Sequence, residues 1–176
     1  MDNYSLLRYM IELTKRIRIT LILSLVAANI GCDQISKTIV RQTIETDQKI
    51  EVFKENLILT KVENRGAAYS IGADLDPVIK TILLQIAPIL VLLYLLRQIL
   101  IKTEYSAETI IGMTFIIGGG IGNILDRILY QSVTDFLILD IGIIKSEIFN
   151  LADVSIMIGS LVIISSILLN RNGSIV

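Results

Sequence analysis

Three aspartates in the second half of the chain have the type and spacing that acid–base chemistry needs. Two belong to Asn-x-x-Asp motifs at 123–126 and 150–153, and the third, Asp135, lies between them in an otherwise apolar run. On a helix, residues i and i+3 share a face, so each Asn can steady the carboxylate one turn away. Two carboxylates held close together share a proton, because both cannot ionise cheaply. One then takes a proton from water while the other donates to the scissile carbonyl oxygen, which predicts peptide hydrolysis without a metal or a covalent intermediate.

A purely structural interpretation of the same residues is also open. Asp126 would pair with Arg127 or Lys37, and Asp135 would be a solvated loop residue. Asn150 would cap a helix whose dipole favours an acidic side chain in its first turn. Spacing alone does not decide between the two interpretations.

The composition indicates an integral membrane protein. Of the 176 residues, 53% are hydrophobic, and the mean hydropathy is +0.69, well above the usual range of soluble domains. There is no His, which excludes Ser-His and Cys-His nucleophile pairs within the chain. The single cysteine, Cys32, excludes an internal disulfide, and the net charge of −1 gives no argument for a nucleic-acid partner.

Other motifs suggest chemistry but favour a structural explanation. The spacing of Gly118 and Gly122 is more typical of close helix packing than of a phosphate-binding loop. Ser36 and Lys37 resemble a Ser/Lys dyad, but adjacent helical residues point in different directions, and Lys37 is better placed as an interfacial partner of Asp33. We expect no metal, although an oxygen-only site can be imagined from Asp33, Asp126, Asp135 and Asp153.

The segments that must position these residues predict a membrane all-α fold in a single domain, 1–176. Two polar segments, 38–77 and 129–149, are expected outside the membrane, and the first contains short strands near 50–53 and 57–62. Pro88 is expected to kink the second helix. Four transmembrane helices are expected at about 17–37, 78–96, 109–128 and 150–169.

Four spans place both polar segments on the same side of the membrane. Asp33, Asn64, Asp126, Asp135 and Asp153 can therefore converge at one interface although they are scattered in the sequence. A raw count of Lys and Arg favours cytoplasmic polar segments, but the positive-inside rule gives most weight to the residues flanking the first helix. We therefore expect cytoplasmic termini and an extracytoplasmic site, because four basic residues precede that helix: Arg8, Lys15, Arg16 and Arg18.

Five motifs in a fixed order resemble those of one known family. They are Asp33 to Lys37 (DQISK), Asn64 to Ser70 (NRGAAYS), Gly119 to Arg127 (GGIGNILDR), Val133 to Phe136 (VTDF) and Phe149 to Asp153 (FNLAD). In this set the chain resembles lipoprotein signal peptidase, also called signal peptidase II, a bacterial membrane aspartyl peptidase. Ser36 and Tyr69 replace the Thr and Phe that are usual in that family, and they keep a hydroxyl and an aromatic ring.

The resemblance implies a role for each candidate site residue. The catalytic pair falls on Asp135 and Asp153, while Asp126 becomes a structural residue paired with Arg127. A second set would support the site or line the substrate groove: Asp33, Lys37, Asn64, Gly66, Asn123, Arg127 and Asn150.

The resemblance also implies a substrate and a location. The substrate would be a bacterial prolipoprotein whose future N-terminal Cys carries diacylglycerol, and cleavage just before that Cys would release the signal peptide. The enzyme would be a multi-pass protein of the cell (inner) membrane, in contact with membrane lipid. We expect a monomer without cofactor and without a nucleic-acid partner.

Two functions of other classes compete with this expectation. A small ion-coupled transporter would use Asp33, Asp126 and Asp153 as a relay, but its charges should lie deep within the spans. A non-catalytic assembly protein would bind partner helices through its glycine face and would tolerate Asp135→Asn.

Overall fold

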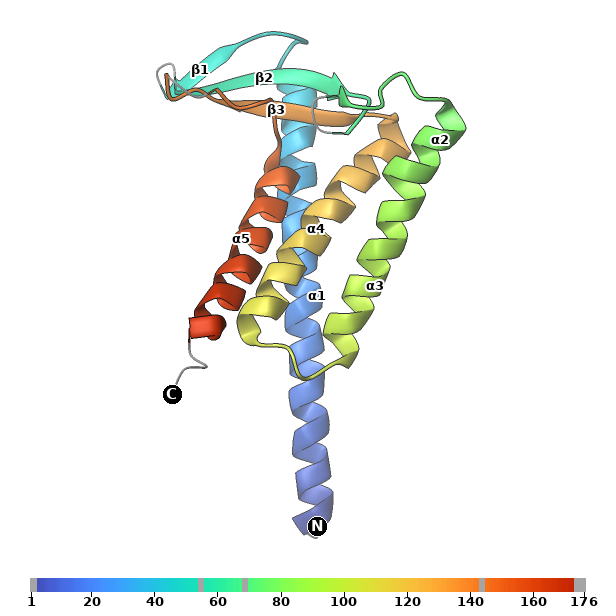
Figure 1. The fold of residues 1–176 in the computed structure, drawn as a ribbon, viewed down its shortest axis with the longest axis vertical. Coiled ribbons are helices and arrows are strands. Elements are labelled where there is room, and N and C mark those ends of the chain that lie inside the picture. Colours follow the sequence, from blue (N-terminus) through green and yellow to red (C-terminus); the bar gives the residue numbers. More distant parts are fainter. Residues whose placement is uncertain (1–2, 54–55, 68–69, 143–144, 173–176) are drawn as a thin grey trace.

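The computed structural model describes residues 3–53, 56–67, 70–142 and 145–172. Four rods form a bundle, and a small sheet lies across one end of it, while both chain termini lie toward the other end (Figure 1). The second rod is built from α2, a π-helical turn η2 and α3 in direct succession. The helices are α1 (Asn3–Thr43), α2 (Pro77–Thr81), η2 (Ile82–Ile86), α3 (Ala87–Ile101), α4 (Ala107–Tyr130) and α5 (Leu151–Asn172).

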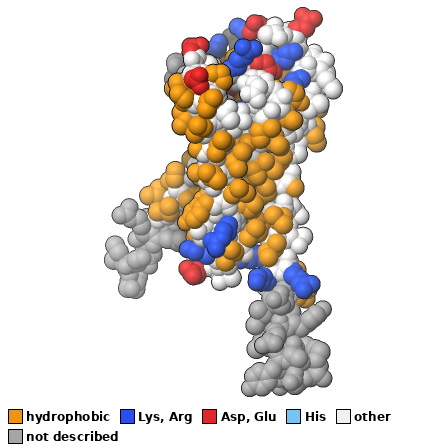
Figure 2. All heavy atoms as spheres, turned by 90° about the vertical axis from the view of Figure 1, so that its right-hand side faces the viewer, with side chains coloured by type: hydrophobic (Ala, Val, Ile, Leu, Met, Phe, Trp, Pro, Cys, Tyr) orange, Lys and Arg blue, Asp and Glu red, His pale blue; other side chains and the backbone are white. Residues whose placement is uncertain are grey.

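Four helical segments are long and apolar enough to cross a membrane, which confirms the expected membrane helix bundle. They are Leu13–Thr43, Pro77–Ile101, Ala107–Tyr130 and Leu151–Leu169. Large apolar side chains cover the outside of the bundle, as at Leu90 and Leu161, which are 62% and 55% exposed. Figure 2 shows this apolar band between two ends where charged side chains gather. An exposed apolar surface of this extent is typical of a protein that lies in lipid.

The first helix differs from the expected 17–37 at both ends. It extends past Lys37 by more than a turn, to Thr43, because no Gly or Pro interrupts residues 38–43. The expectation that Lys37 reaches the membrane interface is wrong, since its side chain is 0% exposed. The cause is a set of buried polar partners, described below with the site.

Pro88 disturbs the regular hydrogen bonding of the second membrane helix, as expected from the sequence. Proline has no N–H to donate within a helix, and its ring crowds the preceding turn. The chain accommodates it through η2, at whose end the Ala87 N–H donates to the Ile82 carbonyl. A single π-turn of this kind is a common local adjustment inside an α-helix.

Three antiparallel strands, in the order β1-β2-β3, make up the sheet. The expected strands are present as β1 (Ile50–Phe53) and β2 (Leu57–Asn64). The third, β3 (Val133–Leu139), lies in the segment expected to be a loop. Its side chains are almost all buried, so it lacks the alternation by which a half-exposed strand is recognised.

Glycines allow α4 to lie close to its neighbours, which confirms the packing interpretation of the glycine motif. A Cβ added at Gly118 would come within 2.6 Å of Asn29 Cβ on α1, and one at Gly119 would meet the Ala152 carbonyl oxygen on α5. Close backbone approach of this kind is what small-residue motifs provide in membrane bundles. Around it, a core of buried apolar side chains joins α1, α3 and α4: Ile22, Val26, Leu92, Ile99, Ile117 and Ile124.

Candidate active site

A cleft of about 380 Å³ opens where the sheet meets the ends of α4 and α5. Asp135 enters it from β3, and Asp153 enters it from the first turn of α5. Four further residues singled out from the sequence also line it: Asn64, Asn123, Arg127 and Asn150. The fold therefore brings together residues from β2, α4, β3 and α5 in a single polar pocket at the end of the apolar bundle.

Asp135 is held by two amide donors in a nearly closed environment. Its side chain is 5% exposed, Asn150 Nδ2 donates to its Oδ1 (2.6 Å) and Asn64 Nδ2 donates to its Oδ2 (3.1 Å). Burial raises the pKa of Asp135 to about 6; the two amide hydrogen bonds oppose this effect, and the nearby Asp153 adds to it. A carboxyl of this kind can hold a proton near neutral pH, as a general acid must.

Asp153 has a different environment, at the N-terminus of a helix. Its Oδ1 accepts from Asn123 Nδ2 (2.8 Å), and its Oδ2 accepts from the Asn150 N–H (3.2 Å). Asn150 Oδ1 in turn accepts from the Asp153 N–H (3.0 Å), which completes a reciprocal capping box. The capping role expected under the structural interpretation is thus present. It coexists with a position in the cleft.

Asn150 links the two carboxylates, since it touches both of them and is fully buried. Hydrogen bonds to an ionised carboxylate and the positive end of a helix dipole favour the charged form, whereas burial favours the neutral form. Two carboxyl groups that face one cleft are an arrangement suited to activating water and protonating a carbonyl oxygen.

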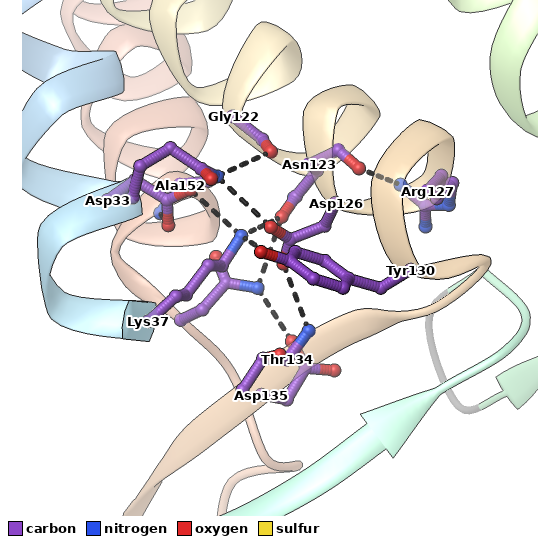
Figure 3. Close-up of polar contacts among 12 residues, drawn as sticks. Asp33, Lys37, Gly122, Asn123, Asp126, Arg127, Tyr130, Thr134, Asp135 and Ala152 are labelled. Atoms are coloured by element: carbon purple, nitrogen blue, oxygen red, sulfur yellow. Dashed lines mark hydrogen bonds and ion pairs between the residues drawn. The ribbon is translucent and has the colours of Figure 1, made fainter. Parts of the chain in front are cut away.

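A buried ion cluster lies directly behind the cleft (Figure 3). Lys37 Nζ lies 2.8 Å from Asp33 Oδ2 and 3.2 Å from Asp126 Oδ2, and it donates to Asn123 Oδ1 (2.9 Å). Asp33 Oδ1 also accepts from the Ala152 N–H (2.9 Å) on α5. These contacts use all three ammonium donors and join α1, α4 and α5, so they explain why Lys37 is buried.

The expected pairing of Asp126 with Arg127 is wrong. Asp126 Oδ1 lies 2.8 Å from Arg41 Nη2, and its Oδ2 lies beside Lys37. Adjacent helical residues point in different directions, so Asp126 faces α1 while Arg127 faces the loop after β2. The sequence did hold a signal for Arg41, because it follows Lys37 by one turn on the same helix face.

Arg127 braces the loop that follows β2. Its Nη2 donates to the Gly66 carbonyl (3.0 Å), and its Nη1 donates to the Asn123 carbonyl (3.3 Å). Asn64 Oδ1 accepts from the Gly66 N–H (2.9 Å), which folds the loop back beneath Asp135. A Cβ at Gly66 would come within 2.6 Å of the Ser70 backbone, so the turn requires glycine. Ala68 and Tyr69 of the same motif lie outside the described residues.

Two other sequence candidates are not assembled as sites. Ser36 Oγ donates to the Asp33 carbonyl (2.7 Å) rather than facing Lys37. In the part of the chain that the structure describes, no group of three or more His, Cys, Asp or Glu side chains is placed to hold a metal ion. Sequence reasoning also missed three residues of the ion cluster and its surroundings: Gln34, Arg41 and Thr134.

Comparison with known proteins gives one consistent result. A family model described as signal peptidase (SPase) II matches residues 25–169. The lipoprotein signal peptidase of Listeria monocytogenes serovar 1/2a is 36% identical over 132 residues, which cover 75% of this chain and 82% of the relative. That of Clostridium novyi is 30% identical over 142 residues (80% and 91%), and that of Neisseria gonorrhoeae is 35% identical over 150 residues (85% and 90%).

The fold has matches among solved structures. Two structures described as bacterial membrane enzymes, solved by the in meso method at 2.3 Å and 1.9 Å resolution, superpose with TM-scores of 0.78 and 0.75. They are 27% and 28% identical to this chain, cover 88% and 85% of it, and are themselves covered to 92% and 93%.

Proposed function

We propose a catalytic pair on the premise that this chain belongs to the signal peptidase II family, membrane aspartic peptidases that remove signal peptides from prolipoproteins. The proposed pair is Asp135 and Asp153. The observation that carries this proposal is the position of Asn150, which contacts both carboxylates at the wall of one cleft. Three further polar residues of the cleft, Asn64, Asn123 and Arg127, orient the pair and the substrate backbone.

Each carboxyl has its own role in the proposed reaction. Asp153 acts as the general base and takes a proton from water, whose oxygen attacks the scissile carbonyl carbon. Asp135 holds the proton and donates it to the carbonyl oxygen, which is consistent with its raised pKa. Collapse of the tetrahedral diol breaks the C–N bond. The leaving amine takes up the proton that Asp153 received, and one diol hydroxyl returns its proton to Asp135, which leaves a carboxylic acid as the second product. No covalent intermediate forms.

The proposed substrate is a prolipoprotein that already carries diacylglycerol on its future N-terminal Cys, cleaved just before that Cys. The cleft lies at the sheet end of the bundle, beside the apolar band. A scissile bond in the cleft would thus sit near the membrane surface while the acyl chains stay in lipid. We place this end outside the cytoplasm and the termini inside, following the basic residues before the first helix.

One chain supplies every described residue of the cleft, so we propose that a single domain and a monomer suffice for activity. The direct test is cleavage by the purified protein of a diacylglyceryl-modified prolipoprotein and of its unmodified form. We expect cleavage of the modified form only, with the released signal peptide ending at the residue before Cys by mass spectrometry. Equal cleavage of both forms would contradict the proposed substrate, and no cleavage of either would favour a transporter or an assembly protein.

A further inference from the structure

Thr134, the residue before Asp135, lies on the other face of β3. Successive strand residues point to opposite faces, and the register pairs Val62 with Asp135 and Glu63 with Thr134. Asp135 and Val62 therefore line the cleft, whereas Thr134 is turned toward α1 and is 0% exposed. Thr134 lies within the Val133–Phe136 motif, but the family resemblance assigns no role to it.

The polar groups of Thr134 are bound by three different elements. Its N–H donates to Asp126 Oδ2 on α4 (3.1 Å). Its hydroxyl accepts from Arg41 Nε on α1 (2.8 Å) and donates to Glu63 Oε1 on β2 (2.8 Å). The single hydroxyl hydrogen and an acceptor lone pair are both used, which fixes the rotamer of the side chain.

The two partners of the hydroxyl are themselves held in place. Arg41 Nη2 lies 2.8 Å from Asp126 Oδ1, an ion pair without hydrogen-bond alignment, and the guanidinium lies 4.0 Å over the Tyr130 ring. Glu63 Oε2 accepts from Ser132 Oγ (2.6 Å). Arg41, Thr134 and Glu63, here called the Thr134 clamp, therefore connect β3 to α1 and to β2 through groups that cannot easily turn away.

The strand ladder ties β3 to β2, and the Phe136 and Leu137 N–H groups donate to the Phe149 carbonyl (3.0 and 2.8 Å), but neither set of bonds joins β3 to α1 or α4. The pairing of β3 with β2 is irregular between Leu59 and Val62, just before the Val62–Asp135 pair. A bulge of this kind bends the strand and disrupts the ladder locally. Meanwhile Asp135 must face Asp153, which belongs to another element, α5.

From these contacts we infer that Thr134 is a positioning residue: the Thr134 clamp sets where β3 lies relative to the bundle and thereby holds Asp135 opposite Asp153. This inference rests on the proposed catalytic pair. Displacement of a reacting group by about 1 Å can reduce the rate of a reaction on the order of a hundredfold. Thr134 faces away from the cleft, so loss of its hydroxyl should slow the chemical step and leave substrate binding largely unchanged.

The test compares Thr134→Val, which keeps the shape and removes the hydroxyl, with Thr134→Ser, which keeps the hydroxyl. Both are assayed on a diacylglyceryl-modified prolipoprotein. We expect Thr134→Val to lower kcat by about ten- to a hundredfold with KM within about twofold of wild type, and Thr134→Ser to recover most of kcat. Thr43→Val is the matched control, because that side chain is exposed and, within the described part of the chain, its hydroxyl bonds only to the Ile39 carbonyl of its own helix; it should behave as wild type.

A second variant keeps the inference testable if Thr134→Val folds poorly. Glu63 is exposed, and Glu63→Ala removes the acceptor of the Thr134 hydroxyl from the surface side. It should also lower kcat, and its effect should be smaller when Thr134→Val is already present, because the two changes share the contact between Thr134 and Glu63. The inference would be overturned by wild-type kcat in Thr134→Val or in Glu63→Ala, or by a change confined to KM. It would equally be overturned if Thr134→Ser were as impaired as Thr134→Val, or if the losses of the double variant were additive. Asp135→Asn is assayed beside these variants to distinguish failure of this inference from failure of the proposed function. Retained activity of Asp135→Asn would contradict the catalytic pair itself.

Discussion

Asn150 Nδ2 lies 2.6 Å from Oδ1 of Asp135, and this one contact joins the start of α5 to the middle of β3. The same asparagine exchanges two hydrogen bonds with Asp153 as the cap of α5. A helix N-terminus and a strand are thus fixed to each other at the point where their acidic side chains share a cleft. Among the described residues, Asn150 is the one whose side chain or backbone bonds to both carboxylates.

Substitutions at Asn150 should therefore distinguish its effect on catalytic geometry from its effect on helix capping. Asn150→Ala removes both the cap and the donor to Asp135, and we expect about 1 kcal/mol lower stability together with loss of activity. Asn150→Ser keeps an N-cap acceptor for the Asp153 N–H but has no amide to reach Asp135. It should recover stability relative to Ala while activity stays reduced by about a hundredfold. Thermal unfolding in detergent and single-turnover cleavage measure the two effects. Full activity of the Ser variant would show that the contact with Asp135 is dispensable.

The raised pKa of Asp135 predicts a falling pH profile. Burial, the largest influence, raises this pKa from 3.8 to about 6, so the proton needed for general acid catalysis is lost as the pH rises through about 6. We expect kcat/KM to fall by about tenfold per pH unit above that point, because this parameter reports the free enzyme. A profile that is flat or rising between about pH 6 and 8, in protein that stays folded, would argue against Asp135 as the acid.

The raised pKa of Asp135 also determines how this group changes the folding stability with pH. The folded protein keeps a proton on Asp135 that the unfolded chain releases, so this group favours the folded state below about pH 4 and this contribution is lost as the pH rises through about 6.

The ion cluster should contribute mainly to folding. Lys37→Met leaves Asp33 and Asp126 without their shared ammonium in a fully buried place, and we expect a loss of about 3–5 kcal/mol in stability. Lys145→Met is the matched control, because its pair with Asp140 spans 3.4 Å with Lys145 57% exposed; that variant should lose less than about 1 kcal/mol. Thermal unfolding of both variants in one detergent checks the comparison. Similar stabilities for the two would mean that the cluster is not a structural brace.

Close approach of α4 and α5 should make Gly119 intolerant of a side chain. Gly119→Ala would press a Cβ against the Ala152 carbonyl oxygen, one residue before Asp153, so both stability and activity should fall. At Gly31 on α1, an added Cβ meets no described atom within 4 Å. Gly31→Ala should therefore be neutral or raise stability by up to about 1 kcal/mol, as Ala favours helix. Equal effects of the two substitutions, measured as thermal stability, would contradict the packing argument.

Hydropathy and segment length were sufficient to predict the four spans, and alternation was sufficient for β1 and β2. The strand β3 could not be predicted in this way, because burial on both faces removes the alternating pattern. Lys37 shows the limit for charged residues. From the sequence it belongs at the interface as a partner of Asp33, and the structure confirms that pairing on the same helix. Only the tertiary arrangement supplies the other two acceptors, on Asp126 and Asn123, that make its burial stable.

The candidate site was predicted by motif resemblance rather than by spacing. Local spacing suggested that each Asn serves the Asp one turn away, and this holds for Asn150 and Asp153. Asn123 instead donates across the cleft to Asp153, and Asp126 turns to α1. A helix face can be read from the sequence, but the neighbour it meets cannot, because that depends on how the helices pack.

The most direct test of the central claim is cleavage of a diacylglyceryl-modified prolipoprotein by Asp135→Asn and Asp153→Asn proteins reconstituted in lipid. Asp76→Asn serves as the control, because Asp76 is an exposed N-cap of α2 and Asn caps equally well. We expect both cleft variants to fold and to lose cleavage by at least about a thousandfold, while the control cleaves at the wild-type rate. Cleavage at the wild-type rate by folded Asp135→Asn or folded Asp153→Asn protein would contradict the assignment of the catalytic pair.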